Sequence, residues 1–261
     1  MMKQIHRDNV TLAYEEAGRG DPALAFIHGG FADHTHFTPQ FDYFKRNHRV
    51  LAMDLRGHGE SDKPQQDYTI TAYSDDIHWL CQQVSIKKPI VIGHSMGGLI
   101  ALETAVRYPD FPAGIVVMET PIAPPAPFVE GLRQFAGALR TSMYREAVVQ
   151  FLNQFIGFGD DPGRRSEVMN GMLGFAQHVG ASSLESYVSY DTVAAAATCK
   201  VPILYISAGF GFADLARFKE LTPHLMVAQT VGSGHYHQLE VPDQVNAMIE
   251  RFIAVSGGDA R

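Results

Sequence analysis

The sequence predicts an α/β protein with a mostly parallel, twisted sheet and helices on both of its faces. Short apolar runs alternate with longer segments of helical spacing along most of the 261 residues. The runs are continuously apolar, which is typical of strands that are buried on both faces of a sheet. Hydrophobic residues make up 46% of the chain, which is enough for a large core.

The expected elements follow one another in a regular order. Residues 3–18 alternate between polar and apolar around a turn-like Arg7-Asp8-Asn9, which predicts an N-terminal hairpin. Apolar runs then predict strands, and periodic segments predict helices between them. The expected strands are 23–28, 49–55, 89–94, 114–119, 201–207 and 224–231, and the expected helices are 71–84, 95–109, 214–221 and 242–253.

One interval interrupts this alternation. It opens with PIAPPAPF, which fits neither a helix nor a central strand because of its prolines. Beyond it lie helical patterns rich in Met, Phe and Leu, with no evident strand. We therefore expect residues 1–121 and 196–261 to form the core, and residues 122–195 to form a helical cap inserted over the sheet.

Composition and charge exclude several classes of function. The formal charge of −7 comes with no basic run that would suit a nucleic-acid backbone. No segment approaches the ~20 apolar residues that span a bilayer, and the first residues do not resemble a secretory signal. Cys81 and Cys199 lack partners at metal spacing and are expected to be reduced packing residues. These observations predict a cytoplasmic protein, monomeric or homodimeric, with no metal, nucleic-acid or membrane partner.

The most specific motif is VIGHSMGG at residues 91–98. It contains G-x-S-x-G between an apolar strand and a helix, where that pattern forms a sharp turn that exposes the serine. Gly93 and Gly97 remove side chains that would clash in such a turn, and the helix N-terminus behind Ser95 favours developing negative charge. The motif indicates a nucleophilic serine.

With these residues the chain resembles the α/β-hydrolase fold family over nearly its whole length. The matching segments are HGG (28–30), DLRGHGESDKP (54–64), GHSMGG (93–98) and GSGHYHQLEVP (232–242). The resemblance implies a covalent acyl intermediate on the serine and no cofactor. It also implies an oxyanion hole formed by the backbone N–H groups of Gly30 and Met96. Asp54, Arg56 and His58 fall in what looks like the family's structural turn, so we expect them to hold loops together.

Twelve histidines compete for the role of general base. The resemblance assigns it to His235, which follows the last expected strand, with His237 as the rival. His94 flanks the nucleophile and is expected to be a packing residue. His34 and His36 either touch substrate or are solvated loop residues.

The carboxylate that would orient the histidine has two candidates. Most family members carry it after the strand that corresponds to residues 201–207, but the expected position near Gly211 is not acidic here. Asp214 would serve if that loop is distorted, although it also suits the N-cap of the next helix. Glu119 ends the strand after the elbow helix, where a minority of the family places the acid, and its burial would be costly without a partner. Asp191 is expected to be a helix cap.

The expected cap is rich in apolar side chains. Phe31 and Phe37, next to the oxyanion loop, and Phe128 and Phe135 are the expected substrate contacts, and Met143, Phe151, Phe155 and Phe158 add apolar surface. No cluster of Arg or Lys is available there to bind a carboxylate or a phosphate.

These features predict a serine hydrolase for a small to medium, largely uncharged ester or lactone. The alternatives are a hydrolase of carbon–carbon bonds in diketone-type substrates and a ligand receptor without turnover on the same scaffold.

Overall fold

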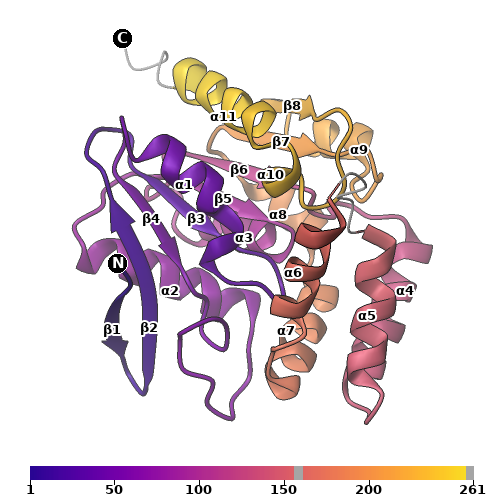
Figure 1. The fold of residues 1–261 in the computed structure, drawn as a ribbon. Coiled ribbons are helices and arrows are strands. Elements are labelled where there is room, and N and C mark those ends of the chain that lie inside the picture. Colours follow the sequence, from indigo (N-terminus) through magenta and orange to yellow (C-terminus); the bar gives the residue numbers. More distant parts are fainter. Residues whose placement is uncertain (156–160, 257–261) are drawn as a thin grey trace.

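The computed structural model describes residues 1–155 and 161–256, and it contains an eight-stranded sheet in the order β1-β2-β4-β3-β5-β6-β7-β8 (Figure 1). Strands β3 to β8 run parallel to one another, whereas β1 and β2 form the expected hairpin and β2 pairs antiparallel with β4. The strands are β1 (Lys3–Arg7), β2 (Val10–Ala17), β3 (Leu24–Ile27), β4 (Val50–Met53), β5 (Ile90–His94), β6 (Gly114–Met118), β7 (Ile203–Ser207) and β8 (Leu225–Gln229).

Both faces of the sheet are buried, as the continuous apolar runs predict. In β3, Ala25 and Ile27 belong to one core cluster, while Leu24 and Phe26 belong to another on the opposite face. The first cluster includes side chains of α2 (Ile70–Gln83), α3 (Met96–Arg107), α8 (Thr192–Thr198) and α9 (Leu215–Leu221). The second includes side chains of α1 (Thr38–Phe44) and α11 (Pro242–Ser256).

Four helices stand apart from these layers at one side of the molecule (Figure 1). They are α4 (Ala126–Leu139), α5 (Tyr144–Phe155), α6 (Pro162–Met172) and α7 (Gln177–Ser189). They share a third hydrophobic cluster, to which the core contributes Tyr236 and Leu239. Within the described part of the interval 122–195 no strand occurs, and α8, which begins inside it, contacts α3 and α9.

Short elements were not expected from the sequence. These are the 3₁₀ turn η1 (His34–Phe37), helix α1 and the single turn α10 (His237–Glu240). Each is too short to show a clear periodic pattern, and tertiary packing determines its conformation. Within the described ranges, no helix has the length and apolar character needed to span a membrane.

Candidate active site

The turn between β5 and α3 has the geometry of a nucleophile elbow. Ser95 adopts φ 52° and ψ −116°, a conformation that non-glycine residues rarely occupy. A Cβ at Gly93 would lie 2.0 Å from the Gly97 carbonyl oxygen, and one at Gly97 would lie 2.1 Å from the Ile27 carbonyl oxygen. The Ser95 N–H donates to the Met118 carbonyl at 2.8 Å, which ties the turn to β6. Only glycines on either side of Ser95 permit so tight a turn.

A cavity beside the elbow brings together the predicted site residues. Its lining includes Ser95, Glu119, His235, Gly30 and Met96. Most of the remaining lining is apolar and comes from the helices α4 to α7 and from the loop after β7. Ser95, Glu119 and His235 follow β5, β6 and β8, so the sheet's carboxyl edge positions all three.

Glu119 faces the ring of His235. Its Oε2 lies 3.9 Å from His235 Nδ1, and neither of these buried atoms has a hydrogen-bond partner among the described residues. Shortening the separation by about 1 Å would make a normal N–H···O bond. The Glu119 carboxylate and the His235 imidazole are therefore oriented toward each other as hydrogen-bonding partners would be.

The other oxygen of Glu119 is fixed by β7. Glu119 Oε1 accepts hydrogen bonds from Ser207 Oγ at 3.1 Å and from the Ala208 N–H. Burial favours protonation of this carboxyl, but the His235 imidazole and the Ala208 N–H favour the anion and hold its pKa below the usual value. The residue has a positive φ of 45°, a strained conformation that directs the side chain toward the cavity.

The loop that carries His235 is held on two sides. The His94 ring places Nε2 2.8 Å from the His235 carbonyl oxygen, and the His235 N–H donates to the Phe155 carbonyl at 3.1 Å. A carbonyl can only accept, so Nε2 of His94 carries the proton. Burial, with His235 and His237 nearby, lowers the pKa of His94 well below its ordinary value and keeps the ring neutral. His94 thus links the elbow directly to the histidine loop, a contact that the sequence does not reveal.

The rival residues take part in other contacts. Asp214 is the N-cap of α9, where its side chain accepts from the Arg217 N–H at 2.9 Å, and it does not line the cavity. His237 is buried with Nδ1 3.2 Å from Thr230 Oγ1. Asp191 caps α8 through the Ala194 N–H, as expected.

The predicted aromatic contacts divide into two groups. Phe31, Phe128 and Phe135 line the cavity, together with Phe151 and Phe155. Phe158 falls outside the described residues, and Met143 lies on the surface.

Phe37 is a correction to the sequence-based expectation. It is fully buried in the sheet cluster of α1 and α11, and its ring centroid is 5.1 Å from that of Phe26. Its position at the end of η1 turns it away from the cavity, and proximity in sequence to the oxyanion loop does not reveal that turn.

The loop after β7 adds an aromatic side chain that was not expected at the site from the sequence. Phe212 lines the cavity and meets the His235 ring edge-on, with a centroid distance of 5.4 Å. It also contacts Phe128 and Phe155 of the cap helices. Gly209 and Gly211 have positive φ angles and let the chain turn twice within this G-F-G-F segment. The position without an acid is therefore occupied by an aromatic wall.

Two further lining residues were not predicted as site residues. Tyr187 of α7 lines the cavity together with Ser95, and the Ser95 hydroxyl offsets part of the rise that burial causes in the pKa of its phenol. His58, expected only to hold a loop, also lines the cavity, and burial lowers its pKa to about 3. A tyrosine or histidine in a helical or turn pattern carries no signal of such a position.

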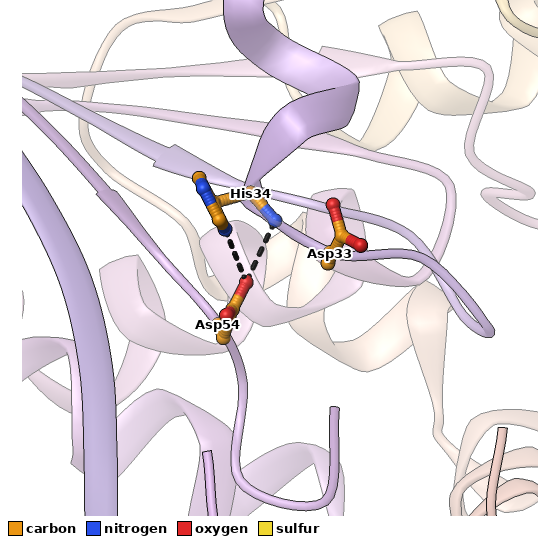
Figure 2. A group of neighbouring side chains, drawn as sticks. All are labelled: Asp33, His34 and Asp54. Carbon is orange, nitrogen blue, oxygen red and sulfur yellow. Dashed lines mark hydrogen bonds and ion pairs between the residues drawn. The ribbon is translucent and has the colours of Figure 1, made fainter. Parts of the chain in front are cut away.

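Asp33, His34 and Asp54 form a separate polar cluster, with one potential ligand atom of each within 4.8 Å of the others (Figure 2). Asp54 Oδ1 accepts from both the backbone N–H and ring Nδ1 of His34 at 2.8 Å, and Oδ2 accepts from the Glu60 N–H. Asp33 Oδ1 accepts from the Thr35 N–H and caps η1. These contacts hold the two loops together, which is the role expected for Asp54.

His34 and His36, the two histidines that follow the oxyanion loop, lie outside the cavity lining. The hydrogen bond that the His34 ring donates to Asp54 raises the pKa of His34. His36 is buried, and its ring packs edge-on against that of Tyr236. Neither side chain is placed to touch a ligand beside Ser95.

Known proteins resemble this chain in sequence and in fold. The chain is 27% identical to 2-(acetamidomethylene)succinate hydrolase of Mesorhizobium japonicum, over 96% of this chain and 94% of that protein. The enol-lactonase of Burkholderia xenovorans superposes with a TM-score of 0.87 at 21% identity, covering 97% of this chain and all of that one. A thermophilic esterase of Thermogutta terrifontis gives a TM-score of 0.86 at 22% identity, covering 98% of this chain and 99% of that one. Residues 22–161 match the model of the alpha/beta hydrolase fold. The chain therefore belongs to the α/β-hydrolase fold family.

Proposed function

We propose that the protein is a serine hydrolase of small to medium, largely uncharged carboxylic esters or lactones. The observation that carries the proposal is one apolar cavity lined by Ser95, His235 and Glu119 together with Gly30 and Met96. Solved structures of similar fold include an esterase and a lactonase, which agrees with this reaction class.

The proposed mechanism uses three side chains. The His235 imidazole takes the Ser95 proton as Oγ attacks the carbonyl carbon, and it later delivers that proton to the leaving oxygen. Glu119 stabilises the imidazolium formed in between, because its carboxylate is held as an anion beside Nδ1. Water then attacks the acyl-enzyme with His235 as the base and releases the acid.

The oxyanion would be stabilised by backbone N–H groups. Met96 is the first residue of α3, so its N–H is one of the groups without an acceptor inside the helix. At Gly30 the nearest atom to an added Cβ would be Met96 Sδ at 4.0 Å, so the main chain is open to a bound ligand. A helix N-terminus also favours the negative charge of the tetrahedral intermediate.

A burst experiment tests the proposal. The wild-type protein should release p-nitrophenol from a short-chain p-nitrophenyl ester with a burst that equals the enzyme concentration. Ser95→Ala should remove both the burst and the turnover, while Ser189→Ala, at an exposed position of α7, should behave as wild type. Wild-type turnover by the Ser95→Ala variant would show that another group is the nucleophile, and tight ligand binding without turnover by the wild type would favour a receptor.

The lining also predicts selectivity for uncharged substrates. Among the described residues that line the cavity, none is a lysine or an arginine, and Glu119 is anionic. Burying a second carboxylate there would cost several kcal/mol without a cationic partner. The kcat/KM for p-nitrophenyl butyrate should exceed that for mono-p-nitrophenyl succinate, which carries a terminal carboxylate, by about 100-fold or more. Equal values for the two esters would contradict an uncharged substrate class.

A further inference from the structure

Tyr187 is placed to act on the reacting oxygen from the cap side of the cavity. It lies on α7 and lines the same cavity as Ser95, and the Ser95 hydroxyl is near enough to its phenol to offset part of the rise that burial causes in the pKa of Tyr187. Its backbone carbonyl accepts from the Tyr190 N–H at the end of the helix, which fixes the residue in place. A hydroxyl group from a cap helix therefore lines the cavity that contains Ser95.

The chemistry of this phenol suits a permanent donor. Burial raises the pKa of Tyr187 far above its ordinary value, and the nearby Glu119 carboxylate raises it further. The group therefore keeps its proton throughout the neutral and alkaline range. Such a group donates a hydrogen bond but takes no part as a base.

We propose that Tyr187 is a catalytic residue whose O–H donates a hydrogen bond to the leaving-group oxygen during acylation. This inference rests on the proposed function. The backbone N–H groups of Gly30 and Met96 would serve the carbonyl oxygen, so Tyr187 is left for the other oxygen of the ester. It would thereby favour substrates whose leaving oxygen is a strong base, such as alkyl esters and lactones.

The acylation step balances without any further reactant. The bond between Ser95 Oγ and the carbonyl carbon forms while the Ser95 proton moves to His235 Nε2. The bond from that carbon to the leaving oxygen then breaks, and the same proton passes from His235 to this oxygen. Tyr187 stabilises the partial negative charge on the leaving oxygen by its hydrogen bond and retains its own proton.

The ring of Tyr187 also forms a wall between two cavities. A second pocket, lined by Leu99, Val129 and Val188, shares Tyr187, Pro121 and Leu132 with the first. Tyr187→Phe keeps this wall and removes only the hydroxyl, whereas an alanine would remove both. The phenylalanine variant is therefore the informative one.

The test compares two butyrate esters that differ only in the leaving group. We expect Tyr187→Phe to lower kcat/KM for ethyl butyrate by about 10- to 100-fold, the range from one lost hydrogen bond to one lost oxyanion donor. For p-nitrophenyl butyrate the loss should stay below about threefold, because p-nitrophenolate needs little stabilisation. The measured constant is kcat/KM because it reports acylation and is not masked by a slow deacylation.

Tyr190→Phe is the matched control, since Tyr190 follows the same helix but donates its hydroxyl to Glu103 Oε2 at 2.8 Å. This variant should change kcat/KM only slightly, and by the same factor for both esters. Labelling of Ser95 by a fluorophosphonate at close to the wild-type rate would show that the Tyr187→Phe site is intact, because fluoride departs without a proton. An equal loss on both esters, or no loss on either, would overturn the role of Tyr187. Failure of the wild-type protein to hydrolyse both esters would instead refute the proposed function.

Discussion

At the scale of single residues, Glu119 shows how one carboxylate can be fixed and kept charged in an apolar site. Ser207 Oγ and the Ala208 N–H bind one of its oxygens, and the other faces His235. The donors and the imidazole outweigh the effect of burial, so the pKa lies below the usual value. A carboxylate with this environment remains an anion over the whole neutral range.

Replacement of the two candidate acids should separate their roles. Glu119→Gln keeps the shape of the side chain but removes the charge that would stabilise the imidazolium, so kcat should fall by about 10³- to 10⁴-fold. Asp214→Asn should leave kcat nearly unchanged, because asparagine also caps helices and Asp214 lies outside the cavity lining. Steady-state kinetics on one p-nitrophenyl ester measures kcat for both variants and for the wild type. The opposite pattern would assign the acid to Asp214.

The sequence allowed the placement of some site residues but not of others. Ser95 lies in a turn whose geometry only a few residues permit, and Glu119 ends a buried strand beside it, so local pattern and strand order locate both. Phe37, Phe212 and Tyr187 differ, because their positions depend on how η1, the loop after β7 and α7 pack. Sequence spacing carries no information on such tertiary contacts.

At the scale of elements, α3 approaches the sheet more closely than an ordinary helix. Gly97 is the reason, because a Cβ there would lie 2.1 Å from the Ile27 carbonyl oxygen and 2.6 Å from that of His28. Both atoms belong to the backbone at the end of β3, so the clash has no simple relief. The close approach brings the N-terminus of α3 to the cavity beside Ser95.

Two glycine substitutions should therefore change the free energy of unfolding in opposite directions. Gly97→Ala should lower the free energy of unfolding by about 2 kcal/mol or more, since the backbone of β3 or α3 must move. Gly137→Ala, inside α4, should raise it by about 0.5–1 kcal/mol, because among the described residues no atom beyond the local helix backbone lies within 4 Å of the added Cβ. Urea unfolding followed by circular dichroism measures the pair. A stabilising Gly97→Ala would contradict the close packing of α3 on the sheet.

The longer strands and helices were predictable because their pattern of apolar residues is strong. The six parallel strands and the helices α2, α3, α9 and α11 lie within a few residues of the expected positions. The C-terminal end of the expected cap interval, residue 195, falls inside α8. This helix packs with α3 and α9 on the sheet face. Composition indicates a helix there, but the partner of an alanine-rich helix depends on the whole fold.

At the scale of the whole molecule, the fold buries several imidazoles as neutral groups. Burial lowers the pKa of His36 to about 4, of His58 to about 3 and of His237 to about 4. His28 and His94 are lowered as well, also by burial. These five buried rings therefore cannot take up protons without loss of packing.

This burial predicts a stability that falls on mild acidification. In the unfolded chain a histidine binds a proton near pH 6.5, whereas in the folded protein His36 does so only near pH 4. The unfolded state therefore binds more protons between these values, and the free energy of unfolding decreases as the pH falls from 6.5 toward 4. One such histidine contributes a slope close to 1.4 kcal/mol per pH unit, about one proton, in the middle of that window.

His36→Gln isolates this contribution. The variant removes one buried imidazole whose Nδ1 has no hydrogen-bond partner in the described part of the chain, and the side chain lies outside the cavity lining. From pH 6 to pH 5 it should lose about 1 kcal/mol less unfolding free energy than the wild type, whatever its stability at pH 7.5. His6→Gln, at an exposed position of β1, should leave the wild-type slope unchanged. Urea unfolding at four pH values between 5 and 7.5 gives the slopes. Parallel curves for His36→Gln and wild type would mean that His36 is protonated in the folded protein as readily as in water, which the buried position of its ring beside Tyr236 does not permit.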